Sequence, residues 1–386
     1  MHLSVQNIHS HPSGDFNSQV TSCLSQIQLY TINDKRKRRI VKMTVFSACE
    51  DNAGYILKRK LLTDILSKSE EYQAPVSLVS QPPLNGETIM EVWILDYTKP
   101  KYTFTFTHTE LSSVLLVDGP DSCCLFSTHA STHHATFKEN TFETFSQLDK
   151  FLQTNRFDYS DIVRQWNYME NIHSIDTVNN IPFQNYQIFN DVRSFFYEKS
   201  AFTKGYPSAT GIGMDHGGCT IEVIAFKGKD TNIMRPVTNS YQIDAHSYSS
   251  TVLEGSAIEE RKTVSTPKFE RGKHMQFPDE GFLFISGTAS IIGEKTVFPD
   301  DVAKQTLTTI NNIEHLVSTK NLNNNNISIV SPPRLLNYRV YLKNASDYPL
   351  VQALCDDHYG TNKGFIVKAD ICRSNLLIEI EANYLV

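Results

Sequence analysis

The stretch Phe282-Leu-Phe-Ile-Ser-Gly-Thr-Ala-Ser-Ile-Ile-Gly-Glu294 decides the fold. An apolar run with strand character enters a tight segment of glycine, threonine and serine, and the carboxylate of Glu294 follows just beyond it. A weaker copy, Leu125-Phe-Ser-Thr-His-Ala-Ser131, lies upstream and lacks both the glycine and the acid. Two copies indicate a duplicated fold, and their difference points to the second copy as the place for chemistry.

The same order of elements follows each copy. After the first, the patterns predict a helix over 141–155, a strand over 162–168, a helix over 186–199 and a strand over 220–226. After the second, they predict a helix from 300 or 301 to 317, a strand over 337–342, a helix over 346–358 and a strand over 376–382. The Asn-rich stretch 321–326 is interpreted as a surface loop. We therefore predict an α+β fold of two tandem mixed sheets, each backed by helices.

Length and composition are those of a globular protein. The 386 residues are 40% hydrophobic and 20% charged, which suits two domains with a sizeable core. The net charge of −6 argues against nucleic acid as the main partner, and no apolar run reaches the ~18 residues that span a membrane. Seven cysteines without a CxxC pair indicate reduced thiols and a cytoplasmic protein.

Residues 1–42 differ from the rest of the chain. They are polar and contain the basic cluster Lys35-Arg-Lys-Arg-Arg39. We interpret them as a flexible or extra segment, upstream of a start near Met43, with a targeting or nucleic-acid role for the cluster as the alternative. The expected organisation is then an N-terminal half over 43–200 and a catalytic C-terminal domain over 201–386.

Several blocks of the chain resemble one known family. The tail containing Tyr338-Arg-Val-Tyr-Leu342 and Asn375-Leu-Leu-Ile-Glu-Ile-Glu-Ala382 resembles the Rid (YjgF-like, chorismate-mutase-like) fold. Further blocks in register are similar to the chorismatase family over roughly residues 44–386: Tyr206 to Gly213, Arg235 to Gln242, Phe269-Glu-Arg271 and Ile285 to Glu294. The resemblance implies removal of the enolpyruvyl side chain of chorismate as pyruvate, with no metal or organic cofactor.

This reaction needs an acid that protonates a carbon atom and groups that hold two carboxylates. A carboxyl group in a partly apolar cleft can keep its proton near neutral pH. Glu294, which follows Ile291-Ile-Gly293, is our candidate for the general acid and base. The alternative for Glu294 is a glutamate in a solvent-facing loop.

Arginine and tyrosine side chains in the matching blocks are the candidates for substrate binding. Arg193 lies two helical turns after Tyr186, so both can share one face of a helix. The full set of candidates for binding is Tyr186, Arg193, Tyr197, Ala209, Thr210, Gly211, Arg271 and Gly287. Arg164 is a weaker candidate, because packing beside Trp166 and Tyr168 would equally explain it.

Other constellations are interpreted structurally. The histidines at 129, 133 and 134 have no cysteine or acid at metal-ligand spacing. Asp215-His-Gly-Gly-Cys219 places its histidine and cysteine on a glycine turn that seldom gives a nucleophile pair its orientation. Ser286 lacks the GxSxG elbow of serine hydrolases.

The ring product depends on few positions. The resemblance implies that Ala209 and Gly287 favour the hydrolytic type, which leaves a dihydroxycyclohexadiene acid, or the mixed type, which makes hydroxybenzoates. The rival functions are a Rid-like enamine or imine hydrolase and a catalytically silent binding protein. A monomer is expected, because a duplicated chain has less need to form a trimer.

Overall fold

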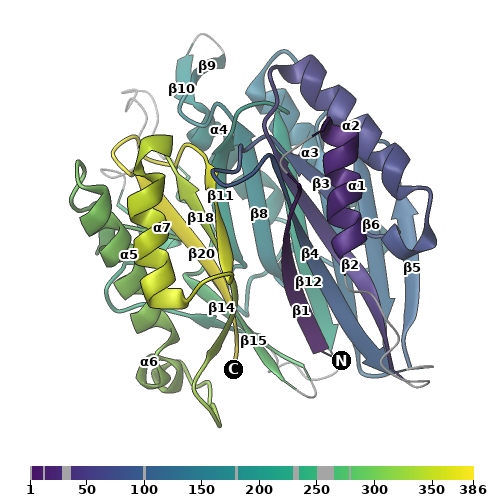
Figure 1. Ribbon diagram of the computed structural model, residues 1–386. Helices are drawn as coiled ribbons and strands as arrows, with labels where there is room; N and C mark the ends of the chain where they lie inside the picture. The colour runs from purple at the N-terminus through teal and green to yellow at the C-terminus, as the bar shows by residue number, and fades with distance from the viewer. Residues whose placement is uncertain are drawn as a thin grey trace.

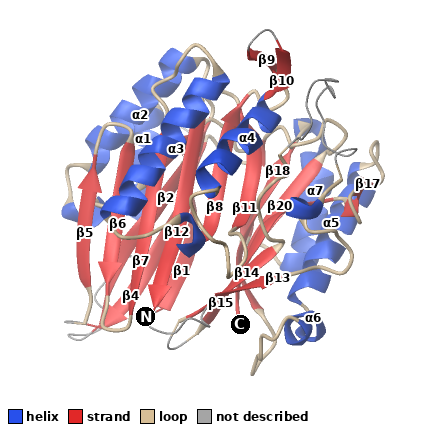
Figure 2. Ribbon diagram, turned by 180° about the vertical axis from the view of Figure 1, so that it is seen from behind, coloured by secondary structure: helices blue, strands red, loops and turns tan. Residues whose placement is uncertain are grey.

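The computed structural model describes residues 2–11, 14–27, 36–98, 101–178, 181–228, 234–249, 265–277 and 280–386. Its three larger sheets each belong to a consecutive stretch of chain, called here unit 1 (2–98), unit 2 (101–228) and unit 3 (234–386). The sheets lie in the interior and the helices cover the outside (Figure 1). Figure 2 shows the same arrangement from behind. Within the described residues, no helix combines the length and apolarity needed to cross a membrane.

Unit 1 has a four-stranded sheet in the order β1-β4-β2-β3. Its elements are β1 (His2–His9), α1 (Phe16–Gln26), β2 (Arg36–Ser47), α2 (Asn52–Leu66), β3 (Val76–Val79) and β4 (Thr88–Thr98). β2 runs parallel to β3 and antiparallel to β4. Asp15 and Asp51 cap the two helices by accepting hydrogen bonds from backbone N–H groups.

Unit 2 has a six-stranded sheet in the order β11-β8-β12-β7-β6-β5. Its strands are β5 (Thr103–His108), β6 (Ser112–Asp118), β7 (Ser122–Ala130), β8 (Ile162–Glu170), β11 (Ser208–Met214) and β12 (Cys219–Gly228). Its helices are α3 (Phe137–Thr154) and α4 (Asn185–Tyr197), and a hairpin of β9 (Ile175–Val178) and β10 (Ile181–Gln184) precedes α4. Thr136 and Glu139 form a capping box that starts α3, whose buried face includes Phe145 and Leu148.

Unit 3 has a six-stranded sheet in the order β13-β14-β15-β20-β18-β19. Its strands are β13 (Met234–Val237), β14 (Gly272–Gln276), β15 (Gly281–Ala289), β18 (Arg334–Leu342), β19 (Gly364–Lys368) and β20 (Ile378–Leu385). Its helices are α5 (Val302–Val317), α6 (Thr319–Asn324) and α7 (Tyr348–Tyr359), and β16 (Ile291–Ile292) pairs with β17 (Lys295–Thr296). Short 3-10 turns occur at Glu70–Tyr72, Tyr159–Asp161, Ala245–Ser247 and Ala345–Asp347.

The three units repeat one topology. The order β11-β8-β12-β7 of unit 2 is matched by β19-β18-β20-β15 in unit 3 and by β3-β2-β4-β1 in unit 1. In every unit the edge strand is parallel to its neighbour and the other pairs are antiparallel. The α+β class and the duplication are therefore confirmed, and the chain contains a third copy that the sequence did not predict.

The start of the chain differs from its expected role. Residues 1–42 were expected to be a flexible or extra segment, but their described part forms β1, α1 and the beginning of β2. Leu3, Val20 and Ile40 are buried, because β1 pairs with β4 and α1 covers the sheet. In the basic cluster, Lys35 lies outside the described residues and Arg38 pairs with Asp96 at 2.9 Å.

Two smaller expectations are also corrected. The boundary at residue 200 is displaced, because β11 and β12 complete the sheet of unit 2. The Asn-rich stretch is mostly helix α6, and Asn321 is buried and donates hydrogen bonds to the carbonyls of Thr238 and Leu316 at 3.0 and 2.9 Å. Local pairing of asparagine amides with backbone carbonyls explains how this polar run is held inside the fold.

A buried glutamate on the central strand of each unit joins that unit to another. Each carboxylate contacts two side chains that lie two residues apart on the neighbouring unit's strand, so both point to the same face. Glu222 contacts Lys42 and Thr44, each at 2.7 Å. Glu381 contacts Arg164 at 2.7 Å and Trp166 at 2.8 Å.

The third contact closes the ring. Glu91 accepts hydrogen bonds from Asn337 at 3.1 Å and Arg339 at 2.8 Å. Each of these three glutamates is at most 2% exposed. The units therefore pack as a pseudo-threefold assembly held by three buried glutamates, each with two polar partners.

Candidate active site

A cavity lies where unit 2 meets unit 3. It has a volume of about 50 Å³ and is bounded by α4 and β11 of unit 2 and by β15 and β20 of unit 3. β11 and β15 are tied together because Ser286 accepts a hydrogen bond from the Ala209 N–H at 2.8 Å and donates one to the Glu270 carbonyl. Ser286 therefore has a structural role, as the missing GxSxG elbow predicts.

One carboxyl group of the cavity wall keeps its proton. Glu379 is 4% exposed, and its carboxyl forms no hydrogen bond or ion pair with another described residue. Burial, followed by repulsion from Glu381, raises the pKa of Glu379 to about 8, against the opposing effect of Arg164 and Arg271. A carboxyl group with this pKa is protonated at neutral pH and can act as a general acid.

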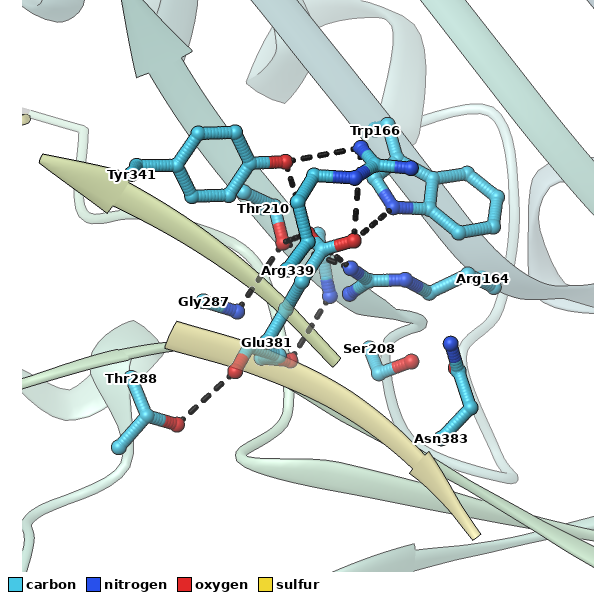
Figure 3. Close-up of polar contacts among 12 residues, drawn as sticks. Arg164, Trp166, Ser208, Thr210, Gly287, Thr288, Arg339, Tyr341, Glu381 and Asn383 are labelled. Carbon is cyan, nitrogen blue, oxygen red and sulfur yellow. Dashed lines mark hydrogen bonds and ion pairs between the residues drawn. The ribbon is translucent and has the colours of Figure 1, made fainter. Parts of the chain in front are cut away.

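Glu381, two residues along the same strand, has the opposite character. Burial alone would raise its pKa, but Arg339 and Arg164 outweigh burial and lower the pKa of Glu381 to about 2. Thr210 and Trp166 also donate hydrogen bonds to this carboxylate, at 2.6 and 2.8 Å. Figure 3 shows these side chains converging on Glu381. Glu381 is thus a fixed negative charge that helps to keep Glu379 protonated.

Two arginines line the same cavity. Arg271 donates hydrogen bonds to the Ile243 carbonyl and to the Tyr248 hydroxyl, both at 2.5 Å. Arg373 donates to the Glu294 carbonyl at 2.9 Å, and its guanidinium lies 5.3 Å from the centre of the Tyr248 ring. A small cavity with two guanidinium groups and one neutral acid suits a ligand that carries two carboxylates.

Gly287 has no side chain, and the Glu379 carboxyl occupies the space that a side chain would fill. A Cβ atom at this position would lie 2.0 Å from the Glu379 Oε1 atom and 3.2 Å from the Thr210 Cγ2 atom. The Gly287 N–H donates to the Thr210 hydroxyl at 3.1 Å, and the same hydroxyl contacts Glu381. The glycine is therefore needed for the close approach of the acid.

Five of the residues predicted for binding meet in this cavity: Tyr186, Ala209, Gly211, Arg271 and Gly287. Thr210 lies directly behind the wall and contacts Arg164 and Glu381. Arg193 and Tyr197 lie on the buried face of α4 itself, where Arg193 donates to Asn190 at 2.6 Å and Tyr197 donates to Gln165 at 2.8 Å. Neither side chain lines the cavity, so they support α4 and do not face a ligand there.

The structure places Glu294 outside the cavity. It stands in the tight turn between β16 and β17, after Gly293 with φ 62°, and its carboxylate accepts hydrogen bonds from the Ser249 N–H at 2.9 Å and hydroxyl at 2.7 Å. These hydrogen bonds lower the pKa of Glu294, so it is ionised at neutral pH. Glu294 does not line this cavity, although it contacts Ser249, which follows Tyr248 of the wall, and its carbonyl binds Arg373. Its role as the acid stays a prediction, and the cavity itself favours another carboxyl.

The other constellations have structural explanations. His129 is buried between the hydroxyls of Ser112 and Ser127 at 2.9 and 3.0 Å, whereas His134 pairs with Glu143 on the surface at 3.0 Å. No group of three or more His, Cys, Asp or Glu placed to hold a metal occurs among the residues that the structure describes. Burial raises the pKa of the Cys219 thiol to about 12, which is the reverse of an activated nucleophile.

The sequence did not identify Glu379, Arg373 or Tyr248 as site residues. A signal for Glu379 was present in Ile378-Glu-Ile-Glu-Ala382, where two acids alternate within a strand that is otherwise apolar. Buried charges in such a strand require partners or a shifted pKa. Arg373 lies in the loop between β19 and β20 and carried no comparable signal.

Comparisons with known proteins agree with the predicted resemblance. Residues 113–225, nearly all of unit 2, match the family model described as chorismatase FkbO/Hyg5-like, N-terminal. The chain is 30% identical over 233 residues to a 3-hydroxybenzoate synthase of Streptomyces hygroscopicus, and 28% identical over 232 residues to a chorismatase of Streptomyces rapamycinicus. Each alignment covers 58% of this chain and 64% of the relative, so it spans less than two thirds of that protein.

A solved structure of a chorismatase has the same fold. It is 20% identical to this chain, with a TM-score of 0.72, and the match covers 99% of this chain and 98% of that one. At this identity the likeness establishes the fold. The resemblance of this chain to the chorismatases is confirmed.

Proposed function

We propose that this protein is a chorismatase, which cleaves the enolpyruvyl ether of chorismate and releases pyruvate and a cyclic acid. The observation that carries the proposal is Glu379, a buried carboxyl with its pKa raised to about 8, facing a cavity that two arginines also line. The relatives named 3-hydroxybenzoate synthase and chorismatase support the choice of substrate.

Glu379 supplies the proton in the first step. The neutral carboxyl protonates the terminal methylene carbon of the enolpyruvyl group, which leaves a methyl group and an oxygen-stabilised cation at the adjacent carbon. Water adds to that carbon and loses a proton to the Glu379 carboxylate, which restores the acid. The resulting hemiketal collapses with cleavage of its bond to the ring oxygen, so one water is consumed and pyruvate and a ring alcohol are formed.

Arg271 and Arg373 hold the two substrate carboxylates. Both guanidinium groups are fixed by hydrogen bonds to backbone or tyrosine oxygens and still have N–H groups for a ligand. Two fixed cations orient the enolpyruvyl group against Glu379 and offset the charge that the substrate brings into the cavity.

Position 287 influences the ring product under this proposal. Gly287 leaves the Glu379 carboxyl unobstructed and, with Ala209 opposite, gives a water molecule access to the cation. We therefore assign the hydrolytic or mixed product type. The ring alcohol is a dihydroxycyclohexadiene carboxylate, and it becomes a 3- or 4-hydroxybenzoate when it loses one water molecule and the ring becomes aromatic. The closed set of three units also supports a monomer, because each unit already packs against the two others.

The test is incubation of the purified protein with chorismate. Pyruvate is followed with lactate dehydrogenase, and the ring product is identified by chromatography and mass spectrometry. We expect equal amounts of pyruvate and ring product. Absence of pyruvate above background would contradict the proposal, and a deaminated product from an imine substrate would favour the Rid-like alternative.

A further inference from the structure

A second cavity lies where unit 1 meets unit 2. Its volume is about 230 Å³, against about 50 Å³ for the cavity that contains Glu379. It is bounded by α2 and β3 of unit 1 and by β6, β7 and β12 of unit 2. These elements lie on the side of the molecule away from α5 and α7 (Figure 1).

The two cavities occupy equivalent places in the repeated fold. α2 and β3 of unit 1 correspond to α4 and β11 of unit 2, and β7 and β12 of unit 2 correspond to β15 and β20 of unit 3. The strand register identifies the residue that replaces the acid. Thr220 is opposite Ala130 in unit 2, as Glu379 is opposite Ala289 in unit 3. The second cavity therefore lacks a proton donor at the position of Glu379.

The wall of the second cavity still carries groups that can hold a ligand. Arg59 of α2 lines it and has one hydrogen bond to another described residue, at 3.4 Å to the Ser131 carbonyl. Ser77 is 5% exposed, and its hydroxyl has no hydrogen-bond partner in the described structure. The Ser77 oxygen has less than 1 Å² of accessible surface, so a ligand can bond to it only after rotation about the Cα–Cβ bond turns the hydroxyl toward the cavity. A buried hydroxyl without a partner is costly, and a ligand that bonds to it removes that cost.

The remaining wall is mainly apolar. Leu62 and Leu66 of α2 and Phe106 of β5 present apolar carbon to the cavity. Glu110, in the turn between β5 and β6, is exposed and so contributes to the outer part only. Thr128, His129 and Thr220 also line the inner part, and each is hydrogen-bonded to another protein group. The groups left for a ligand are one guanidinium, one unpaired hydroxyl and apolar side chains.

We propose that this cavity is a second ligand site, which binds a small carboxylic acid with a six-membered ring without transforming it. The carboxylate pairs with Arg59, the ring packs against the leucines and Phe106, and a ring hydroxyl bonds to Ser77. A hydroxybenzoate has all three features, whereas benzoate lacks the hydroxyl. The proposal does not depend on turnover of chorismate.

The test measures binding of 3-hydroxybenzoate and benzoate by calorimetry to the parent and to Arg59→Gln, with Arg271→Gln as the matched control in the other cavity. We expect Arg59→Gln to lower the affinity about tenfold or more, because one charge-assisted contact to the carboxylate is lost. Arg271→Gln should leave this affinity unchanged. Ser77→Ala should weaken the binding of 3-hydroxybenzoate and leave the binding of benzoate unchanged. Misfolding would weaken the binding of both acids.

Two results would overturn the inference. Either 3-hydroxybenzoate fails to bind, or its binding is lost in Arg271→Gln and unaffected by Arg59→Gln. If binding requires Arg59 but the protein does not cleave chorismate, the second ligand site is supported and only the proposed reaction is contradicted. Pyruvate release should be the same in Arg59→Gln as in the parent.

Discussion

The cavity between units 2 and 3 and the cavity between units 1 and 2 are built from the same elements but have different chemistry. The first holds Glu379 and two arginines, whereas the second holds Thr220 at the equivalent position and a single arginine. The larger cavity is thus the one without the acid. The comparison teaches that a repeated fold supplies the walls, and that a few substitutions decide whether a cavity binds or reacts.

The largest expected effect is at the acid. Glu379→Gln should lower the rate of pyruvate release by roughly 10³-fold, because an amide cannot donate the proton that reaches the methylene carbon. Glu294→Gln is the matched control and should change the rate by less than about twofold, since this side chain lies outside the cavity. Loss of activity in Glu294→Gln with retention in Glu379→Gln would reverse the assignment.

The second effect is at the glycine that faces the acid. Gly287→Ala should lower kcat by roughly 100-fold, because its Cβ would lie 2.0 Å from the Glu379 Oε1 atom and must displace it. Thr128→Ala changes the corresponding wall of the second cavity and should leave the rate unchanged. An unchanged rate in Gly287→Ala would show that the position of Glu379 is not critical.

The third effect is at the two cations. Arg271→Gln and Arg373→Gln should each lower kcat/KM by roughly 10- to 100-fold, because each removes a charged hydrogen bond to a substrate carboxylate. Steady-state kinetics with chorismate would measure this decrease in kcat/KM. Arg59→Gln, in the second cavity, is the control and should show no decrease. A variant of either arginine with unaltered kcat/KM would remove that residue from the site.

The smallest effect appears in the pH dependence. Because the pKa of Glu379 is raised from 4.5 to about 8, activity should fall about tenfold per pH unit above about pH 8, where the acid is ionised. Ionisation also opposes folding, so the cost to stability is absent below about pH 4.5 and grows until about pH 8. The thermal midpoint of Glu379→Gln should therefore rise relative to the parent over this range, and a constant difference would argue against the shifted pKa.

Much of the fold could be predicted from the sequence, because strand alternation and helical periodicity are local. The patterns identified β15, β20, α3 and α5 close to their observed positions. Unit 1 was missed because the exposed faces of β1 and α1 make residues 2–26 look polar, and their buried residues contact β4 far along the chain. The pairing of strands that lie far apart in the sequence cannot be predicted from a local pattern of residues.

The site was harder to predict because it depends on distant partners. Gly287, Ala209 and Arg271 were found from the blocks of the family resemblance, and they do line one cavity. Glu294 was chosen because it follows the distinctive segment, but its turn directs it to Ser249. The pKa of Glu379 is set by burial, by Glu381, and by Arg164 of β8 and Arg271 just before β14, so only the assembled structure distinguishes it.

The most direct test of this account is the protonation state of Glu379. Infrared difference spectra between the parent and Glu379→Gln would be recorded from about pH 5 to about pH 10, without substrate. The parent should show a protonated carboxyl signal that disappears with a pKa of about 8 and is absent from the variant. A spectrum in which the carboxyl is already ionised at about pH 6 would show that Glu379 cannot be the proton donor at neutral pH.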